Sequence, residues 1–409
     1  MAGYIEDRWW TKRPDPSTGK KRKTSRYGTG MRWRVAGIPG VRDRSFERLE
    51  DAKTWRSTAL TDTKRQEFID PRQGSILLRD YVETVWWPAR RDPVGTAGPM
   101  RSRIWNHLLP HIGHLPLNAI DRDHLRALLA TLRDKGLAES TIELVWIHLT
   151  SIFRSAVGTR LVKNPCSEMA DERPRGGGQT KARAWSREEV RAIRAALPER
   201  YRVCVDLGVV AGLRQGEAFG ISLDDIDEEH GLLHVRRQLL WDPSKPYFKL
   251  PKGRKERQVP LSPGLLKAIL LHAEQRPPVV RSLPWHGPGN GKRQKADVGL
   301  LVTTWFGNPI NPSTFNEETW KPALAGAGLL AERDLEAEGS GWEPSRDMMF
   351  HRCRHTYASV QLHAGEDVVS LSHWMGHSSP KITLDTYAHF MPDLGRRGRS
   401  AVDAWMAAD

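Results

Sequence analysis

Polar and charged side chains recur between His351 and His389, in a stretch whose other residues are typical of a packed helical core. His351 and Arg354 lie three residues apart, and Tyr387 follows Gly376-His377 by ten residues. Charged and polar side chains are seldom buried without partners. The fold must therefore gather these side chains with suitable partners, and their chemistry suggests a site for an anion.

Two upstream segments offer further cations. Arg214 stands in the Gly-bounded segment 211–217, directly after an apolar run. Segment 251–261 offers Lys252 on a predicted hairpin turn. Lys249 and Lys255 are alternatives, but the position relative to Val259-Pro260-Leu261 favours Lys252. A guanidinium meets two phosphate oxygens at once and stays protonated, so Arg214 and Arg354 are predicted to clamp a phosphate.

The histidines fall at positions with different expectations. If 351–362 is helical, His351 and Arg354 share a face, because residues three apart are neighbours on a helix. With an unperturbed pKa near 6.5, His351 can accept a proton or hold a phosphate oxygen. His377 precedes Ser-Ser-Pro, a context typical of a helix start. His355 and His373 are expected to be structural.

This ordered set resembles the active site of the tyrosine recombinase (phage integrase) family: Arg, Lys, His-x-x-Arg, Gly-His and Tyr. The resemblance is specific over residues 181–395, moderate over 73–172 and weak over 1–70. One departure is Arg352-Cys353, where the family more often has an acid and a leucine.

The resemblance implies a role for each residue. Tyr387 is the nucleophile that attacks a DNA phosphodiester, and a nearby base must take its proton because the phenol pKa is near 10. Lys252 is the general acid for the departing 5′-hydroxyl. Glu217, three residues after Arg214, matches an acidic position of the family and is expected to orient other groups of the site and not to catalyse. The expected activity is site-specific DNA recombination through a 3′-phosphotyrosyl intermediate, without a cofactor or metal.

Two other functions are considered. A metal-dependent hydrolase would use the pairs His351/His355 and His373/His377, which have ligand-like spacing. Neither pair has the form H-E-x-x-H, and this function leaves the arginines and Tyr387 unexplained. A DNA-binding regulator without catalysis would need a basic surface but not the six-residue set.

The charge of the chain is strongly positive and uneven. Its formal net charge is +14, which is typical of a protein that binds a polyanion such as DNA. Residues 1–72 contain 18 Lys and Arg against 10 Asp and Glu, so more than half of the surplus lies there. Three β-prone runs and a helical pattern over 48–66 predict a three-stranded sheet plus helix for domain 1–70. This domain resembles the arm-type DNA-binding domain of integrases.

Residues 73–172 have helical periodicity throughout. The clearest apolar stripe runs over 140–157, with shorter ones at 121–134 and 77–87. They predict a small all-helical domain, which the resemblance identifies as the core-binding domain. The Gly-rich basic segment 173–181 is predicted to be a linker.

Residues 181–395 are predicted to form a mixed α/β catalytic domain, so that the whole chain is mainly α with small β-sheets (α+β). Strands are expected over 232–240 and 247–261, the second of them broken at Gly253, and an irregular insertion or exposed loop is expected over 275–298. The tail, 396–409, contains a short apolar helical pattern over 400–408. In the family such tails dock onto a neighbouring protomer.

The remaining features concern location and partners. Cys166, Cys204 and Cys353 are too widely spaced for a disulfide framework or a zinc site, and no apolar run reaches membrane-spanning length, so a cytoplasmic protein is expected. The expected partners are double-stranded DNA attachment sites and accessory DNA-bending or directionality proteins. Because two duplexes exchange through four cuts and each protomer offers one Tyr387, a homotetramer on DNA is also expected.

Overall fold

The computed structural model describes residues 3–39, 41–64, 73–92, 94–176, 181–242, 244–286, 294–336, 341–343, 345–391 and 395–407. The chain divides into two compact units, Met1–Gly178 and Gln179–Asp409. This division falls inside segment 173–181, and the predicted catalytic domain lies within the second unit. The predicted boundary between the first two domains lies largely outside the described residues.

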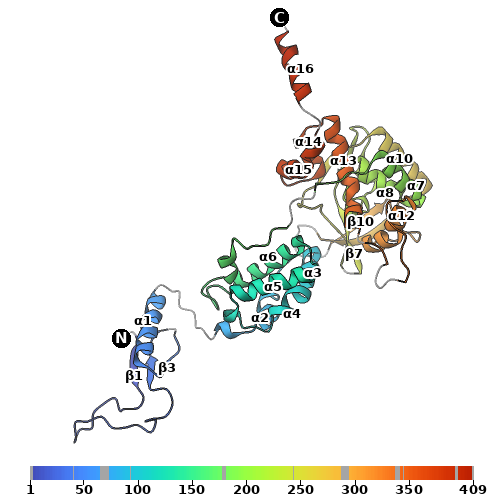
Figure 1. Cartoon of the computed structure of the whole chain (residues 1–409). Coiled ribbons are helices and arrows are strands. Elements are labelled where there is room, and N and C mark those ends of the chain that lie inside the picture. The colour runs from blue at the N-terminus through green and yellow to red at the C-terminus, as the bar shows by residue number, and fades with distance from the viewer. Residues whose placement is uncertain are drawn as a thin grey trace. The chain divides into compact units, whose positions relative to one another are not determined.

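The N-terminal part is a small sheet covered by one helix (Figure 1). Strands β1 (Tyr4–Asp7), β2 (Trp33–Ala36) and β3 (Arg44–Phe46) form an antiparallel sheet in that order. Helix α1 (Leu49–Lys64) packs on it, and Val35 and Ala52 are fully buried between them. The predicted sheet plus helix is therefore confirmed. Residues 20–23, a basic run in the β1–β2 connection, are exposed.

The next part is all-helical, as predicted. Its helices are α2 (Leu78–Tyr81), α3 (Val94–Arg103), α4 (Leu109–Ile112), α5 (Arg122–Asp134) and α6 (Glu139–Ala156). The side chain of Asp121 caps α5 by accepting hydrogen bonds from two backbone N–H groups. The apolar stripe of α6, including Ile142, Leu149 and Phe153, is buried in the core of this bundle.

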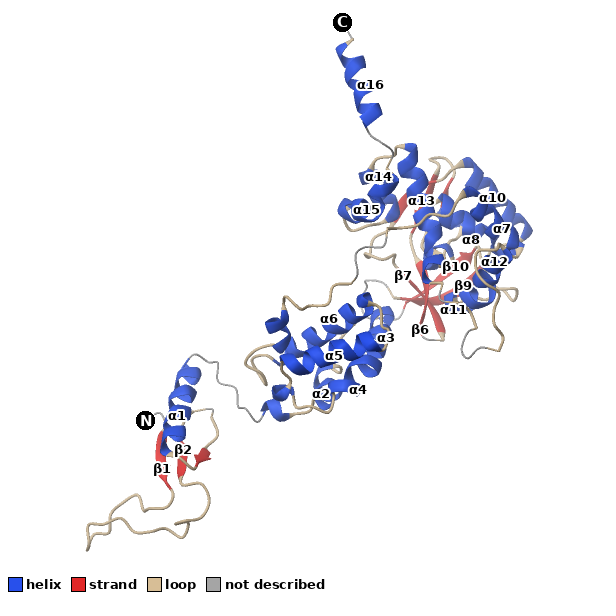
Figure 2. Cartoon of the chain, viewed as in Figure 1, coloured by secondary structure: helices blue, strands red, loops and turns tan. Residues whose placement is uncertain are grey.

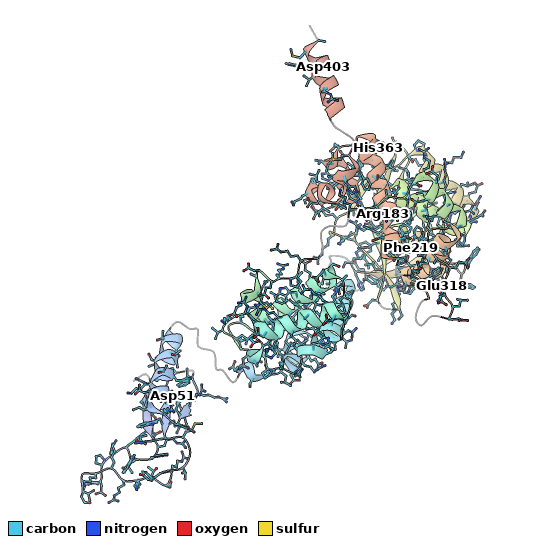
Figure 3. All side chains as sticks on the ribbon, in the orientation of Figure 1. Asp51, Arg183, Phe219, Glu318, His363 and Asp403 are labelled. Carbon is cyan, nitrogen blue, oxygen red and sulfur yellow. The ribbon has the colours of Figure 1, made fainter. Side chains whose placement is uncertain are left out.

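The second unit is a larger helical core with two small sheets, in which the fully buried Phe219 is a central side chain (Figures 2 and 3). Its helices are α7 (Arg187–Ala196), α8 (Glu199–Val210), α9 (Gln215–Ala218), α10 (Pro263–Gln275), α11 (Pro312–Phe315), α12 (Lys321–Gly326), α13 (His351–Ala364), α14 (Val368–Met375), α15 (Pro380–Tyr387) and α16 (Gly395–Met406). Helix α13 packs against α8. The mainly α fold with small sheets is confirmed.

One long antiparallel hairpin, whose two arms are each interrupted, contributes two strands to each of the two sheets. Strands β5 (Leu232–Val235) and β6 (Gln238–Asp242) form the first arm, and β7 (Lys245–Lys249) and β8 (Arg257–Pro260) form the second. Strand β4 (Ile226–Asp227) borders β5. The tip of this hairpin lies between β6 and β7, so Lys252 is not on a hairpin turn as predicted. It does lie in a turn, in which the N–H of Arg254 donates to the carbonyl oxygen of Pro251 at 2.9 Å, at the predicted strand break. Residues 250–256 instead form a loop that interrupts the second arm, where the first arm has only Arg236 and Arg237.

The segment predicted to be an irregular loop over 275–298 contains two strands. Strands β9 (Val279–Trp285) and β10 (Gln294–Leu300) pair antiparallel and extend the four-stranded sheet in the order β10-β9-β7-β6. The prediction failed because the prolines and glycines of this segment are typical of loops. Pro284 is nevertheless accommodated within β9, and residues 287–293 lie outside the described part.

Helix α16 spans most of the predicted tail. Its residues Val402, Trp405 and Met406 are 60%, 77% and 70% exposed, so no described part of the chain covers this apolar face. No helix in the described ranges is both long and apolar enough to cross a membrane.

Candidate active site

A fully buried carboxylate, Glu217, is at the centre of the site. Arg214 donates from Nη1 to Oε1 of Glu217 at 2.9 Å, and its backbone N–H donates to Oε2 at 2.9 Å. Arg257 approaches from β8 and donates from Nη1 and Nη2 to the same two oxygens, at 2.9 and 2.6 Å. Burial alone would raise the pKa of Glu217, but Arg257, Arg214 and Arg354 outweigh it and bring the pKa to about 2. The carboxylate therefore stays ionised.

Arg354 comes from α13 and is 1% exposed. Its Nη1 donates to the backbone oxygen of Gly212 at 2.7 Å, and its Nη2 donates to the backbone oxygen of Met375. Burial and the charge of Arg214 lower the pKa of Arg354, but a guanidinium remains charged near neutral pH. Arg354 thus connects the turn before α9 to the end of α14.

Gly212 and Gly376 explain how these turns come so close. Gly212 has φ +64°, and a Cβ there would lie 2.4 Å from Cδ1 of Tyr357. Gly376 has φ +62°, ends α14, and accepts a hydrogen bond from Nη2 of Arg214 at 3.4 Å through its carbonyl oxygen. Positive φ favours glycine, so both positions suit this residue.

His377 follows the glycine that ends α14. Its backbone N–H donates to the carbonyl oxygen of Ser372, which places the residue in the C-terminal cap of α14. Two residues later Ser379 is the N-cap of α15, so the predicted helix start is present as well. Its Nδ1 lies 2.8 Å from Oγ1 of Thr383, which fixes the ring. Burial, Arg354 and Arg214 lower the pKa of His377 to about 3, so the imidazole is neutral at physiological pH.

Tyr387 is the last residue of α15 and is 2% exposed. Its ring lies parallel to that of His377, with 6.3 Å between the centroids. Burial raises the pKa of Tyr387 to about 12, although the charges of Arg354 and Arg214 act in the opposite direction. The hydroxyl is therefore protonated before any reaction, within the field of these two arginines.

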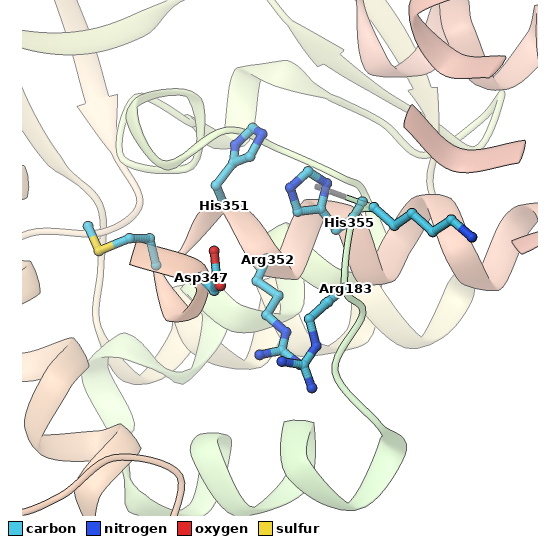
Figure 4. Close-up of a pocket in the computed structure, with 8 residues that line it drawn as sticks. Arg183, Asp347, His351, Arg352 and His355 are labelled. Atoms are coloured by element: carbon cyan, nitrogen blue, oxygen red, sulfur yellow. The ribbon is translucent and has the colours of Figure 1, made fainter. Parts of the chain in front are cut away.

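His355 contacts the hydroxyl of Tyr387, with 2.8 Å between Nδ1 and Oη. Its ring packs edge to face with His351, the first residue of α13, at 4.8 Å between centroids. His351 is exposed as a residue, but its imidazole is partly buried, and this burial and the neighbouring charges of His355 and Arg354 lower its pKa to about 4. Both histidines line a cavity of about 190 Å³ (Figure 4).

Lys252 is exposed on the loop that interrupts the second arm of the hairpin. Its charge is one of those that lower the pKa of His351. The seven residues selected from the sequence all lie in the second unit. Arg214 pairs with Glu217, and ring contacts join Tyr387 to His377 and, through His355, to His351. The charge of Arg354 acts on both groups. The effect of Lys252 on the site is electrostatic, through the pKa of His351.

Two residues of the site were not selected from the sequence. Arg257 is in phase with the buried Val259 on β8, and an arginine on the inward face of a strand signals a buried partner. His355 was expected to be structural. Its spacing of four from His351 places both on one helix face, which was a signal for a shared site.

The departure at Arg352-Cys353 has a structural explanation. Arg352 is 7% exposed, lies 3.7 Å over the ring of Trp185, and donates from Nη2 to the carbonyl oxygen of Ala184 at 3.1 Å. Cys353 is buried in the core. Arg352 therefore holds the segment before α7 against α13, and Figure 4 shows its guanidinium beside that of Arg183.

The arrangement has a surplus of positive charge. Three guanidinium groups, from Arg214, Arg257 and Arg354, surround Glu217, and only Arg214 and Arg257 pair with it within the described residues. Such a group favours an anion with several oxygens. No cluster of three or more His, Cys, Asp or Glu side chains in the described ranges is placed to hold a metal ion.

The chain resembles known proteins in both sequence and fold. Residues 185–392 match the model of the phage integrase family. A XerC-like tyrosine recombinase of Caldanaerobacter subterraneus is 29% identical over 277 residues, which cover 64% of this chain and 65% of the relative. The integrase of Mycobacterium phage D29 is 24% identical over 378 residues, covering 88% of this chain and 90% of the relative.

Solved structures share the fold. The integrase of the Tn1549 transposon, in complex with transposon right end DNA, superposes with a TM-score of 0.61 at 18% identity, covering 80% of this chain and all of that one. A lambda integrase tetramer bound to a Holliday junction gives a TM-score of 0.56 at 17% identity, covering 96% of this chain and 95% of that one. The family model matches more than half of the chain, over the segment that contains the whole site. The protein belongs to the phage integrase family of tyrosine recombinases.

Proposed function

We propose that the protein is a site-specific DNA recombinase that integrates or excises a mobile element through a 3′-phosphotyrosyl intermediate. The observation that carries this proposal is the position of the Tyr387 hydroxyl, buried and within the field of Arg354 and Arg214. A DNA-binding regulator has no need of a buried nucleophile beside a cluster of cations. A metal-dependent hydrolase leaves this tyrosine unexplained.

In the proposed reaction Arg214 and Arg354 hold the non-bridging oxygens of the scissile phosphate, where negative charge develops in the transition state. Glu217 and Arg257 keep Arg214 in place. Tyr387 attacks the phosphorus, Lys252 gives a proton to the departing 5′-oxygen, and His351 and His377 border the phosphate. The covalent link preserves the bond energy for rejoining to another strand, so the reaction needs no nucleotide cofactor. The arginines provide the charge stabilisation that a metal provides elsewhere.

The proposed substrate is double-stranded DNA that carries attachment sites. The proposed location of the protein is the cytoplasm, on this DNA. The first unit contributes binding: its exposed basic run at 20–23 suits an arm-type site, and the helical part suits the core site. A homotetramer is the proposed assembly, supported by the lambda integrase tetramer on a Holliday junction. Accessory DNA-bending or directionality proteins complete the proposed set of partners.

Covalent trapping tests the proposed reaction. The full chain is incubated, in the presence of a chelator, with a duplex that carries the DNA junction flanking its gene. A nick beside the cleavage site releases the short 5′-hydroxyl strand after cleavage, so that rejoining is blocked. We expect a denaturant-resistant protein–DNA adduct. Tyr387→Phe should bind the same duplex and form none. An adduct that requires Mg²⁺, or that persists in Tyr387→Phe, contradicts the mechanism.

The tail is proposed to dock onto a neighbouring protomer, since the apolar face of α16 is exposed at Val402, Trp405 and Met406. Deleting residues 400–409 should leave binding to a single site intact and weaken the four-protomer complex on paired sites. Native gel electrophoresis with one or two sites per duplex measures both. The control is Asp403→Asn, a single substitution at an exposed position of the same helix. If the truncated chain assembles as the full chain does, docking of the tail is contradicted.

A further inference from the structure

The hydroxyl of Tyr387 needs a base, and the residues around it differ in their access to it. Within the described part of the chain, its one hydrogen bond is to Nδ1 of His355, at 2.8 Å. His377 lies parallel to the Tyr387 ring, and its Nδ1 is bound to Thr383. His351 packs against His355. Of the histidines that the structure describes, His355 is therefore the one whose ring nitrogen is within hydrogen-bond distance of the nucleophile.

We propose that His355 receives the phenol proton of Tyr387 during strand cleavage, while His351 contacts the phosphate. This inference rests on the proposed function and extends it. His355 must carry its hydrogen on Nε2, so that Nδ1 is the acceptor. As the Oη–P bond forms, the Oη–H bond breaks and its proton moves to Nδ1, and the P–O5′ bond breaks as Lys252 protonates O5′. During rejoining the incoming 5′-hydroxyl returns a proton to Lys252, and His355 returns its proton to Oη.

The titratable and charged groups around His355 fit this role. They are His351, Arg352 and Arg354 on its own helix, Tyr387 on α15, Lys181 and Arg183 before α7, and Asp347 before α13. Burial, Arg354 and Arg352 lower the pKa of His355 to about 4, so the ring is neutral and its lone pair is available. A bound DNA phosphate would offset the charge of Arg354 and raise this pKa toward its ordinary value. DNA binding thus makes His355 a stronger base when it is needed.

The cavity in Figure 4 provides the means of a specific test, because a small base can reach the position of His355 through it. The rate of adduct formation is measured with the full chain and the nicked duplex. His355→Ala should be slower by about 100-fold at neutral pH, the usual contribution of a general base. Added imidazole should restore part of the rate in His355→Ala and none in His351→Ala. Without imidazole, the rate of His355→Ala should rise with pH, by about tenfold per unit while the phenol remains protonated.

Two further variants separate proton transfer from positioning and folding. His355→Asn offers an acceptor oxygen to the Tyr387 hydroxyl but cannot take the proton, so it should bind duplex normally and cleave as slowly as His355→Ala. His363→Ala, on the exposed end of the same helix (Figure 3), is the matched control and should cleave at the rate of the unmodified chain.

The outcomes also separate this inference from the proposed function. If the unmodified chain forms no adduct through Tyr387, the proposed function itself fails. If that adduct forms and His355→Ala or His355→Asn retains the full rate, the role of His355 is overturned. A loss in His355→Ala that neither imidazole nor higher pH relieves also overturns it, because it marks a structural residue.

Discussion

Replacing Arg214 with alanine is expected to slow DNA cleavage by about a hundredfold or more while leaving duplex affinity nearly unchanged. Arg214 keeps 19% of its side chain exposed and is one of three guanidinium groups around Glu217, so its loss leaves Glu217 paired with Arg257. Losing one fixed donor to a transition-state oxyanion costs about 3 kcal/mol. Adduct formation and equilibrium binding, measured on the same duplex, separate the two effects.

Arg191→Ala, on the exposed side of α7, is a suitable control for this substitution. Arg354→Ala should slow cleavage as well, but it also leaves the carbonyl oxygens of Gly212 and Met375 without their donor, so the folded state should be less stable. Arg214 therefore gives the cleaner comparison. Equal loss of binding and cleavage in Arg214→Ala would mark an ordinary phosphate contact.

Replacing Glu217 with alanine is expected to lower the free energy of unfolding by about 3–5 kcal/mol, because breaking a buried ion pair leaves uncompensated charges. Arg214 and Arg257 would then face each other without the carboxylate that both now contact. Chemical denaturation of the full chain measures the change. Glu228→Ala, an exposed position, should change the stability by less than about 0.5 kcal/mol. A similarly small change in Glu217→Ala would contradict the central place of this carboxylate.

The pH dependence of that contribution follows from the lowered pKa of Glu217. The ordinary value is 4.5 and the folded value is about 2, so the ionised carboxylate stabilises the fold above pH 4.5. This stabilisation is lost as the pH falls from 4.5 toward 2. The difference in stability between the unmodified chain and Glu217→Gln should therefore be constant near neutrality and shrink in that acidic range.

The sequence was most informative where one periodicity or one glycine decides the geometry. His351 and Arg354 were predicted on one helix, and both lie on α13. The apolar stripe over 140–157 became α6, because its spacing allows only one buried face. Three β-prone runs and a helical pattern likewise sufficed for the N-terminal sheet and helix.

The sequence was less informative where contacts between residues far apart in the chain decide the position of a side chain. Arg257 is held by Glu217, forty residues away, and this pairing depends on how β8 packs against α9 and α14. The contact between His355 and Tyr387 joins α13 to α15 and has no local pattern. The strand break at Gly253 was predicted correctly, but Lys252 was expected on a hairpin turn, whereas β7 and β8 pair with different strands and not with each other. In the structure Gly253 has φ +99° within the loop that interrupts the second arm.

The most direct test of the account is to identify which residue becomes linked to DNA. The trapped adduct is digested with nuclease and trypsin, and the peptide that retains a nucleotide is sequenced by mass spectrometry. The chain has seven tyrosines, and cleavage after Lys381 and Arg396 isolates Tyr387 from the other six. The account predicts a nucleotide on Tyr387 of peptide 382–396. A nucleotide on any other residue, or cleavage without a covalent link, would contradict it.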